Sequence, residues 1–222
     1  MTPRVIVIGG SDQGRQAIDI IEEVGGNEVV GVLDRTLSGN VGRYPVLGSD
    51  EGLAAVAASS GATAFVVAIG DNFARHRVLT REIARSPHLA PLRVVHPSAV
   101  VARSADIGPG SIIMAGVVVS NGCRVGSGAL LGTGSSLDHD CVLGDGASLA
   151  PGVTTGGGVR IGECTAIGLG ANVLHGVAIG SNTVVGAGAL VLEDVPDRVV
   201  AYGTPARVVR SREPDELYLD VS

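Results

Sequence analysis

The sequence predicts two different architectures in one chain: a Rossmann-like α/β domain followed by a left-handed parallel β-helix. Strand-like and helix-like segments alternate over residues 1–97, and an aliphatic residue recurs at every sixth position from residue 101. The 222 residues include 34 glycines, no tryptophan and only 2% aromatic residues. A core without aromatic bulk has to be assembled from small aliphatic side chains in a regular stack, which is typical of repeat proteins.

The first domain, expected over residues 1–97, follows a β-α-β pattern that indicates a small parallel sheet with right-handed crossovers. Short apolar runs predict strands over 4–10, 28–34, 62–70 and 92–95, and the segments between them predict helices over 12–24, 50–60 and 73–85. The last helix is rich in arginine, which indicates a solvated face: Arg75, Arg77, Arg81 and Arg85.

The second domain, expected over residues 98–195, has a period of six. Fifteen of the sixteen positions in the series that runs from Val101 to Val191 are aliphatic, and only Thr155 breaks it. Neither a helix nor a simple strand predicts this period, whereas a hexapeptide-repeat β-helix does. Three hexapeptides form one triangular coil, so residues 101–190 give five full coils. Glycines follow many inward positions and are expected at tight corners that require positive φ. Residues 196–222 are expected to form a C-terminal tail.

Composition excludes several classes of function. The net charge of −6 argues against a nucleic-acid-binding surface. The chain shows no secretory signal and no apolar stretch long enough to span a membrane. Cys123, Cys141 and Cys164 form no CxxC pattern and are read as reduced thiols, so the cytoplasm is the expected compartment.

The candidate catalytic group is His139, which lies between two acids, Asp138 and Asp140. Positions three hexapeptides apart stack in successive coils, so Asn121 lies one coil below His139 and Gly157 one coil above. An adjacent acid fixes the tautomer of a histidine and stabilises its imidazolium, which suits a general base. The Gly157 amide could donate a hydrogen bond to a developing oxyanion. The alternative is a solvated turn histidine.

The remaining histidines and cysteines suggest no other chemistry. His175 is two coils from His139, roughly 10 Å by rung spacing, and is expected at the surface. No two histidines or cysteines stand at ligand spacing within one hexapeptide, so no metal is expected.

The first domain offers two candidate loops for a nucleotide at the C-terminal edge of its sheet. The first loop contains Gly9, Gly10, Ser11 and Gly14, and its amides and the following helix N-terminus could bind a phosphate. Asp34 ends the second strand where a ribose hydroxyl is held in Rossmann-like folds, and Arg35 follows it. The second loop comprises Gly70, Asp71 and Asn72. A purely structural glycine turn is the alternative.

Several motifs together resemble one family of enzymes. They are Val7-Ile8-Gly9-Gly10 with Gly14, Ala68-Ile69-Gly70-Asp71-Asn72, His96-Pro97-Ser98-Ala99, the segment 136–144 around His139, and Tyr202-Gly203-Thr204-Pro205-Ala206-Arg207. Over almost its whole length the chain resembles the sugar O- and N-acyltransferases related to sialic acid O-acetyltransferase and to the bacillosamine and perosamine 4-N-acetyltransferases.

The resemblance implies a homotrimer with active sites at the subunit interfaces and with acetyl-CoA as co-substrate. The first domain would bind a nucleotide-linked amino sugar, with no metal or tightly bound cofactor. His139 would be the base that takes the proton of the sugar amine, Asp140 its partner, and Gly157 the amide donor to the thioester carbonyl. The residues implied to contact coenzyme A are Gly168, Gly186, Ala187, Pro205, Ala206 and Arg207.

Three positions depart from the family pattern. Ser148 stands where relatives commonly have a second histidine, Gly132 where they often have asparagine, and Gln13 where the first loop often has histidine. Because two of these positions face the acceptor in relatives, the identity of the acceptor stays open. The expected activity is N-acetylation of a nucleotide-linked amino-deoxysugar. The alternatives are O-acylation, transfer to a non-sugar amine, or a non-catalytic β-helix scaffold.

Overall fold

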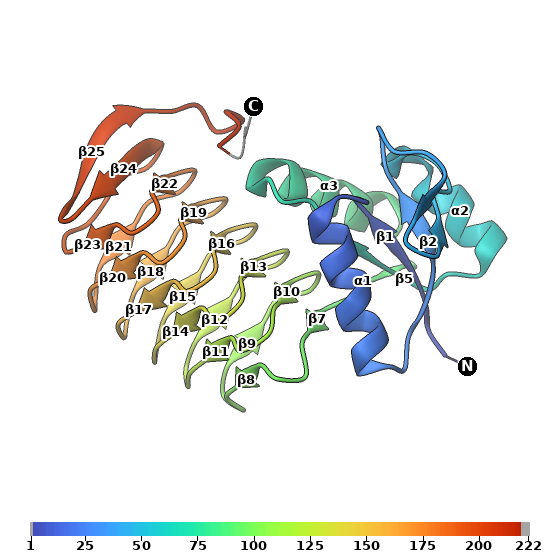
Figure 1. Ribbon diagram of the computed structural model, residues 1–222, viewed down its shortest axis with the longest axis horizontal. Coiled ribbons are helices and arrows are strands. Elements are labelled where there is room, and N and C mark those ends of the chain that lie inside the picture. The colour runs from blue at the N-terminus through green and yellow to red at the C-terminus, as the bar shows by residue number, and fades with distance from the viewer. Residues whose placement is uncertain (1, 219–222) are drawn as a thin grey trace.

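The computed structural model describes residues 2–218 and consists of an α/β domain that leads into a β-solenoid (Figure 1). The α/β domain lies beside the solenoid, with α1 near the first coil and α3 alongside later coils, where Asn72 contacts Thr165. The predicted fold class is confirmed: an α/β Rossmann-like domain precedes a left-handed parallel β-helix.

The sheet of the α/β domain has the strand order β2-β1-β5-β6, and its strands are parallel. Its elements are β1 (Arg4–Ile8), α1 (Asp12–Val24), β2 (Glu28–Leu33), β3 (Asn40–Val41), β4 (Tyr44–Pro45), the 3₁₀ helix η1 (Asp50–Gly52), α2 (Leu53–Ser60), β5 (Ala64–Val67), α3 (Asn72–Arg85) and β6 (Ala90–Pro91). The expected helices and the first three strands are confirmed. The β3–β4 hairpin was not expected from the sequence.

Two-residue strands build the solenoid, and strands three hexapeptides apart pair between successive coils, as Ile112 with Leu130. Its strands are β7 (Val94–Val95), β8 (Val100–Val101), β9 (Asp106–Ile107), β10 (Ile112–Ile113), β11 (Val118–Val119), β12 (Arg124–Val125), β13 (Leu130–Leu131), β14 (Ser136–Leu137), β15 (Val142–Leu143), β16 (Ser148–Leu149), β17 (Thr154–Thr155), β18 (Arg160–Ile161), β19 (Ala166–Ile167), β20 (Asn172–Val173), β21 (Ala178–Ile179), β22 (Val184–Val185) and β23 (Leu190–Val191).

The strands form three parallel sheets along the solenoid. Sheet 1 runs from β7 through β10, β13, β16 and β19 to β22, sheet 2 from β8 to β23, and sheet 3 from β9 to β21. In each coil the chain passes from sheet 1 to sheet 2 and then to sheet 3.

Both expected boundaries of the solenoid need correction. The strand at 94–95 pairs with β10, so it forms the first rung of sheet 1, and the boundary after residue 97 falls inside the first coil. Residues 196–222 were expected to be a tail. Instead β24 (Val199–Gly203) pairs with β22, and β25 (Ala206–Ser211) returns antiparallel to β24, so this hairpin extends sheet 1. The backbone donors and acceptors at the last coil are thereby satisfied in part by the hairpin.

Two columns of glycine serve two different purposes in the coils. A glycine directly after an inward residue permits close stacking: a Cβ on Gly108 would lie 2.5 Å from the carbonyl carbon of Gly126 in the next coil. The corner two residues later requires positive φ, as at Gly110 (φ 70°). The expectation that the first column adopts positive φ was wrong, because its role is the close approach of backbones.

Arg75 joins the two domains, and the expectation that it lies on a solvated face was wrong. Its side chain is fully buried. All five of its N–H groups have acceptors: the carbonyl oxygens of Ile69, Gly70, Gly128 and Gly146, and the Asn72 side chain, at 2.7–2.9 Å. Because Gly128 and Gly146 belong to the solenoid, this guanidinium fixes the start of α3 against the coils.

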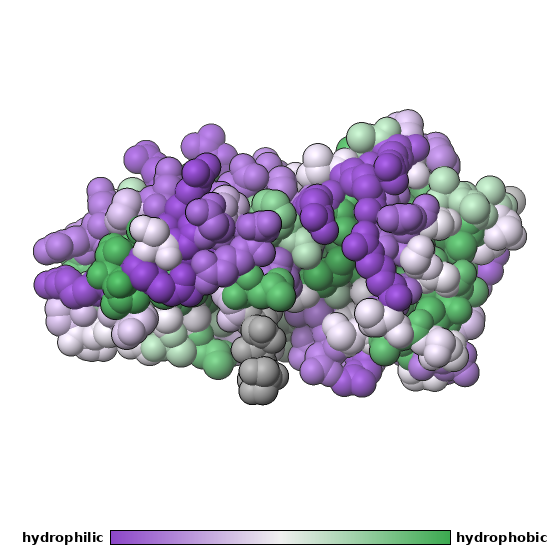
Figure 2. Space-filling model, turned by 90° about the horizontal axis from the view of Figure 1, so that it is seen from above, coloured by the Kyte–Doolittle hydropathy of each residue, from purple (hydrophilic) through white to green (hydrophobic). Residues whose placement is uncertain are grey.

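Hydrophilic residues cover much of the face seen in Figure 2, with apolar patches on both domains. No helix among residues 2–218 has the length and apolar character that crossing a membrane requires.

Candidate active site

His139 lies in the turn between β14 and β15, where its ring is held by the next residue. The Nδ1 atom is 2.9 Å from Oδ2 of Asp140, and both side chains are exposed. The hydrogen bond that His139 donates to Asp140 and the negative charge of Asp138 raise the pKa of His139 above its ordinary value. With Nδ1 bonded to a carboxylate, Nε2 is the nitrogen left to exchange a proton.

Asp140 is positioned by unusual backbone geometry. It occupies a corner position where most coils have glycine, and its φ is 59°. Its N–H donates to the carbonyl oxygen of Asn121 one coil below, at 2.9 Å. A Cβ on Gly122 would collide with the Asp140 carboxylate. The carboxylate therefore depends on the glycine beneath it, and left-handed backbone at a non-glycine residue is a feature that recurs at functional sites.

Gly157 lies directly above His139, as the register of the coils predicts. A Cβ on Gly157 would collide with Nε2 of His139, so only glycine leaves that nitrogen open. The neighbouring Gly158 N–H donates to the carbonyl oxygen of His139 at 2.8 Å, whereas the Gly157 N–H has no hydrogen-bond partner among the described residues. A proton acceptor and an unused amide donor thus lie side by side.

A groove of about 430 Å³ runs along the outside of sheet 1 and its turns toward sheet 2. Gly168, Gly186 and Ala187, which were expected to contact coenzyme A, line one part of it. Its walls are mostly aliphatic: Met114, Leu130, Leu149, Ala166, Ile167, Leu169, Val184 and Val185. Pro205 lies in the turn between β24 and β25, Ala206 and Arg207 begin β25, and Tyr202 of this hairpin packs on Gly186 at the groove.

The three departures from the family pattern meet in this same groove. Gln13, Gly132 and Ser148 all line it, with Gly70 from the α/β domain. Tyr218 also lines it and was missed by sequence reasoning, because it lies outside every repeat and motif. The only sequence signal for Tyr218 was its rarity, since the chain has three tyrosines in all.

His139 and the groove lie at different edges of one chain. The groove follows sheet 1 and the turns that lead into sheet 2, whereas His139 follows β14 at the opposite edge of sheet 2. His139 is not among the residues that line the groove. The exposed His175 is two coils above His139, as expected.

The first loop of the α/β domain is packed tightly against the sheet. A Cβ on Gly9 would lie 2.5 Å from the carbonyl oxygen of Ala68, and one on Gly14 would collide with the carbonyl oxygen of Gly9. Ser11 precedes α1 without a side-chain capping bond. These glycines therefore have structural roles, and they also leave the loop free of side chains that would cover a bound phosphate.

Asp34 organises the turn after β2. Its carboxylate accepts from the N–H groups of Gly10, Thr36 and Leu37 at 2.8–3.0 Å. Burial acts to raise the pKa of Asp34, but these hydrogen bonds outweigh it and hold the pKa below its ordinary value. The Oδ2 atom accepts only from Gly10 among the described residues, so it retains capacity for a ligand hydroxyl.

A cavity of about 190 Å³ lies beside Asp34 and is lined by Gly9, Arg35 and Arg77 among others. Arg35 makes a two-point ion pair with the buried Asp50, at 2.7 and 3.0 Å, and Arg81 holds the same carboxylate. Arg35 is therefore positioned at the cavity but already partnered.

The second loop differs from the expectation at Asn72. This side chain is buried, donates to the carbonyl oxygen of Thr165 at 3.1 Å and accepts from Arg75, so it joins the domains and has no free atom for a nucleotide sugar. Asp71 caps α3 by accepting from the N–H of Ala74 at 2.8 Å. Of this loop, only Gly70 lines the groove.

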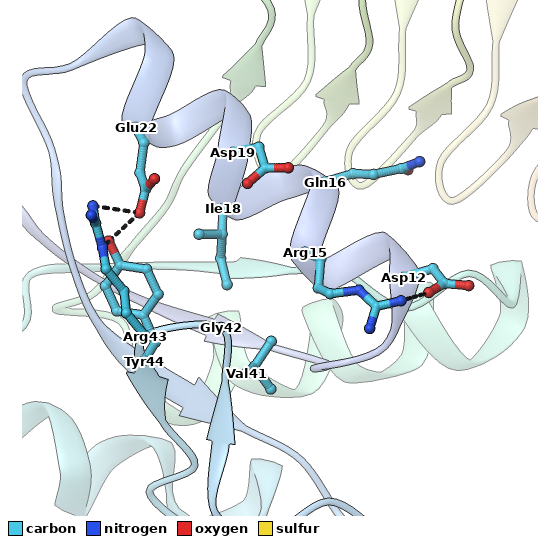
Figure 3. A pocket seen from close by; sticks show the side chains of 10 residues that line it. All are labelled: Asp12, Arg15, Gln16, Ile18, Asp19, Glu22, Val41, Gly42, Arg43 and Tyr44. Carbon is cyan, nitrogen blue, oxygen red and sulfur yellow. Dashed lines mark hydrogen bonds and ion pairs between the residues drawn. The ribbon is translucent and has the colours of Figure 1, made fainter.

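A further cavity, of about 590 Å³, lies between α1 and the β3–β4 hairpin (Figure 3). Arg43 and Tyr44 point toward Glu22, and Arg15 pairs with Asp12. The guanidinium groups of Arg43 and Arg15 are thus paired with carboxylates of the same cavity wall. None of the catalytic candidates lines this cavity.

One group of ionisable side chains stands at the junction of α3 and the solenoid. His76, Glu163 and Cys164 have potential ligand atoms within 4.8 Å of one another. Burial raises the pKa of the Cys164 thiol to about 12, so the thiol is protonated at neutral pH. None of the three lines the groove.

Comparisons with known proteins place this arrangement in a family. The model of the PglD N-terminal domain matches residues 4–81. The structure of PerB from Caulobacter crescentus, in complex with CoA and GDP-perosamine, is 37% identical, with a TM-score of 0.88 over 95% of this chain and 99% of that one. The acetyltransferase domain of PglB from Neisseria gonorrhoeae, in complex with acetyl coenzyme A, is 32% identical, with a TM-score of 0.88 over 94% and 100%.

WeeI from Acinetobacter baumannii is 26% identical, with a TM-score of 0.83 over 94% of this chain and 100% of that one. A search of curated protein sequences returned no significant match. The likeness to PerB and PglB covers 95% and 94% of this chain, so it extends over both domains. The chain therefore belongs to the hexapeptide-repeat sugar N-acetyltransferases, a family of acyltransferases that use acetyl-CoA.

Proposed function

We propose that this chain transfers the acetyl group of acetyl-CoA to the amine of a nucleotide-linked amino-deoxysugar. The observation that carries the proposal is the pairing of His139, bonded through Nδ1 to Asp140, with the unused Gly157 amide above it. PerB, which binds CoA and GDP-perosamine, and the PglB domain, which binds acetyl coenzyme A, support the two substrate classes. A structure of the PerB enzyme with one histidine replaced by alanine is also among the similar structures.

The proposed step is direct attack of the sugar amine on the thioester carbonyl carbon. His139 Nε2 takes a proton from the nitrogen as the C–N bond forms, and the Gly157 N–H donates to the oxyanion of the tetrahedral intermediate. Collapse re-forms the carbonyl and breaks the C–S bond. The imidazolium then returns the proton to the departing thiolate, so the products are the amide and free coenzyme A.

The two halves of this machinery require a second copy of the chain. One chain would supply the groove and the nucleotide edge, and its neighbour would supply His139. Exposed apolar side chains lie on sheet 2 and at its edges, with Val100 62%, Val118 39%, Leu169 57% and Leu174 42% exposed. Burying this face around a three-fold axis would close a homotrimer and bring the two edges together.

Complementation tests this shared site. His139→Ala removes the base and Ala187→Trp fills the groove at an exposed position, so each variant alone should be inactive. Refolding the two together should restore turnover, because mixed trimers contain interfaces with an intact groove and an intact histidine. If mixing restores nothing while each variant remains folded, the site lies within one chain.

The reaction itself is tested by following thiol release from acetyl-CoA. GDP-perosamine should be acetylated at its amine, and neither an amine-free GDP-sugar nor a simple alkylamine should support turnover at similar concentration. Acetylation of hydroxyls or of the alkylamine would favour the alternative acyltransferase activities. If no acceptor released thiol, the scaffold alternative would stand.

We also propose a cytoplasmic location, supported by three free cysteines that are all buried.

A further inference from the structure

The C-terminal segment after β25 is held in place by hydrogen bonds to the solenoid and within itself. It begins at Arg212, which is buried and whose N–H donates to the carbonyl oxygen of Arg198 at 2.9 Å. The Arg212 guanidinium donates to the carbonyl oxygens of Asn182, at 2.8 Å, and Glu216. Glu216 in turn pairs with Arg210 at 2.6 Å. These bonds fold the segment into a strap.

The strap, residues 212–218, runs from the far end of the solenoid back toward α3 (Figure 1). Its Pro214 shares a cavity wall with Phe73 and His76 of α3. At its end, the Tyr218 hydroxyl donates to the carbonyl oxygen of Gly70 at 3.4 Å, and the Tyr218 side chain lines the groove together with Ser148. The strap thus places the Tyr218 side chain where the α/β domain adjoins the groove.

This place is where an acceptor has to pass. The nucleotide would be held by the loops of the α/β domain, and the acetyl group would arrive along the groove. Gly70 belongs to the first of these regions and Ser148 to the second, and Tyr218 lines the groove with both. A sugar that links them must lie beside the Tyr218 ring.

We infer that Tyr218 is a specificity-determining residue of the acceptor site, whose ring closes the groove and whose hydroxyl exchanges its long hydrogen bond to the Gly70 carbonyl for one donated to an oxygen of the nucleotide-linked amino sugar. The inference rests on the proposed function. It also gives a physical reason for Ser148, since a small side chain there leaves room for the phenol that the strap supplies.

The protonation state of Tyr218 fits a donor. Burial raises the pKa of Tyr218 above its ordinary value, so the phenol keeps its proton at neutral pH. It is therefore not a base that competes with His139, and its contribution is binding and selection.

Kinetics of Tyr218→Phe test the inference, with GDP-perosamine and acetyl-CoA as the probes. We expect the KM for GDP-perosamine to rise about 3- to 10-fold, as loss of one neutral hydrogen bond predicts, with kcat and the KM for acetyl-CoA within about two-fold of wild type. Tyr44→Phe removes a hydroxyl that does not line the groove, and Leu217→Ala changes an exposed neighbour on the strap, so both should leave the acceptor KM unchanged.

A double-mutant cycle distinguishes a role of Tyr218 in acceptor selection from a purely structural role of the strap. Ser148→His should impair acceptor binding because the larger ring displaces the Tyr218 phenol, and Tyr218→Ala should relieve much of that defect in the double variant. An unchanged acceptor KM in Tyr218→Phe, or a Ser148→His defect that is the same with and without Tyr218, would overturn the inference. So would an equal rise in both KM values accompanied by a lower Tm, which would indicate a structural role.

Failure of the proposed function can be distinguished experimentally from failure of the role assigned to Tyr218. If wild-type protein releases no thiol with GDP-perosamine or any other nucleotide-linked amino sugar, the proposed function fails, and this inference fails with it. If wild type turns over and the Tyr218 variants match it, only the role of Tyr218 is refuted.

Discussion

Arg75 allows a prediction of stability to be worked out from counted hydrogen bonds. Its five N–H groups meet five acceptors, four of which are backbone carbonyl oxygens at the domain junction. Arg75→Lys keeps the charge but offers three donors, so at least two acceptors lose their partner. Each buried polar group left unpaired costs about 1–3 kcal/mol, which gives a loss of about 2–6 kcal/mol in the free energy of unfolding.

Chemical and thermal unfolding measure this loss. For a chain of this size, Tm falls by about 2–4 °C per kcal/mol, so Arg75→Lys should lower it by roughly 5–20 °C. Arg77→Lys, the same exchange at an exposed position of α3, should change the free energy of unfolding by no more than about 0.5 kcal/mol. If the two variants unfold at the same midpoint, the five-bond network does not hold the junction together, and the reasoning from bond counts is refuted.

The remaining predictions concern the active site. His139→Ala should lower kcat by about 10²- to 10⁴-fold with little change in the KM for acetyl-CoA, and retention of a third of wild-type turnover would make His139 a structural residue. Because Asp140 raises the pKa of His139 and only the neutral imidazole accepts a proton, activity should rise as pH increases through that raised pKa. Asp140→Asn should move the inflection to lower pH and cost less turnover than His139→Ala, and an unmoved inflection would assign the titration to another group. Gly157→Ala should abolish turnover by covering Nε2 while the Tm stays close to wild type, and an active variant would show that Nε2 is not the reacting atom.

The repeat allowed most of the fold and the centre of the candidate site to be predicted. Because each coil contains three hexapeptides, residues that occupy the same position in successive coils stack on one another. The neighbours of His139 could therefore be predicted from their spacing in the sequence. Asn121 lies below it and Gly157 above it, and the Asp140 carboxylate bonds its ring.

Contacts between segments of different period were not predictable in the same way. Arg75 is one of four arginines on a helix, and nothing in its local sequence distinguishes the buried one from Arg77. Tyr218 reaches the groove only because the hairpin reverses the chain and the strap is anchored by Arg212. The strand at 94–95 begins only three residues after β6 ends, and only its pairing with β10 assigns it to the solenoid.

The uniform register of the coils restricts how the groove can change in length. Deleting a single residue would turn every later inward side chain toward solvent, whereas removing three consecutive hexapeptides would excise one coil and leave each column stacked as before. The distance along the groove from Ser148 to the hairpin therefore changes only in whole coils, each about 4.8 Å long. Donors of different reach can be accommodated along this scaffold only by adding or subtracting complete turns, or by altering the side chains that project from them.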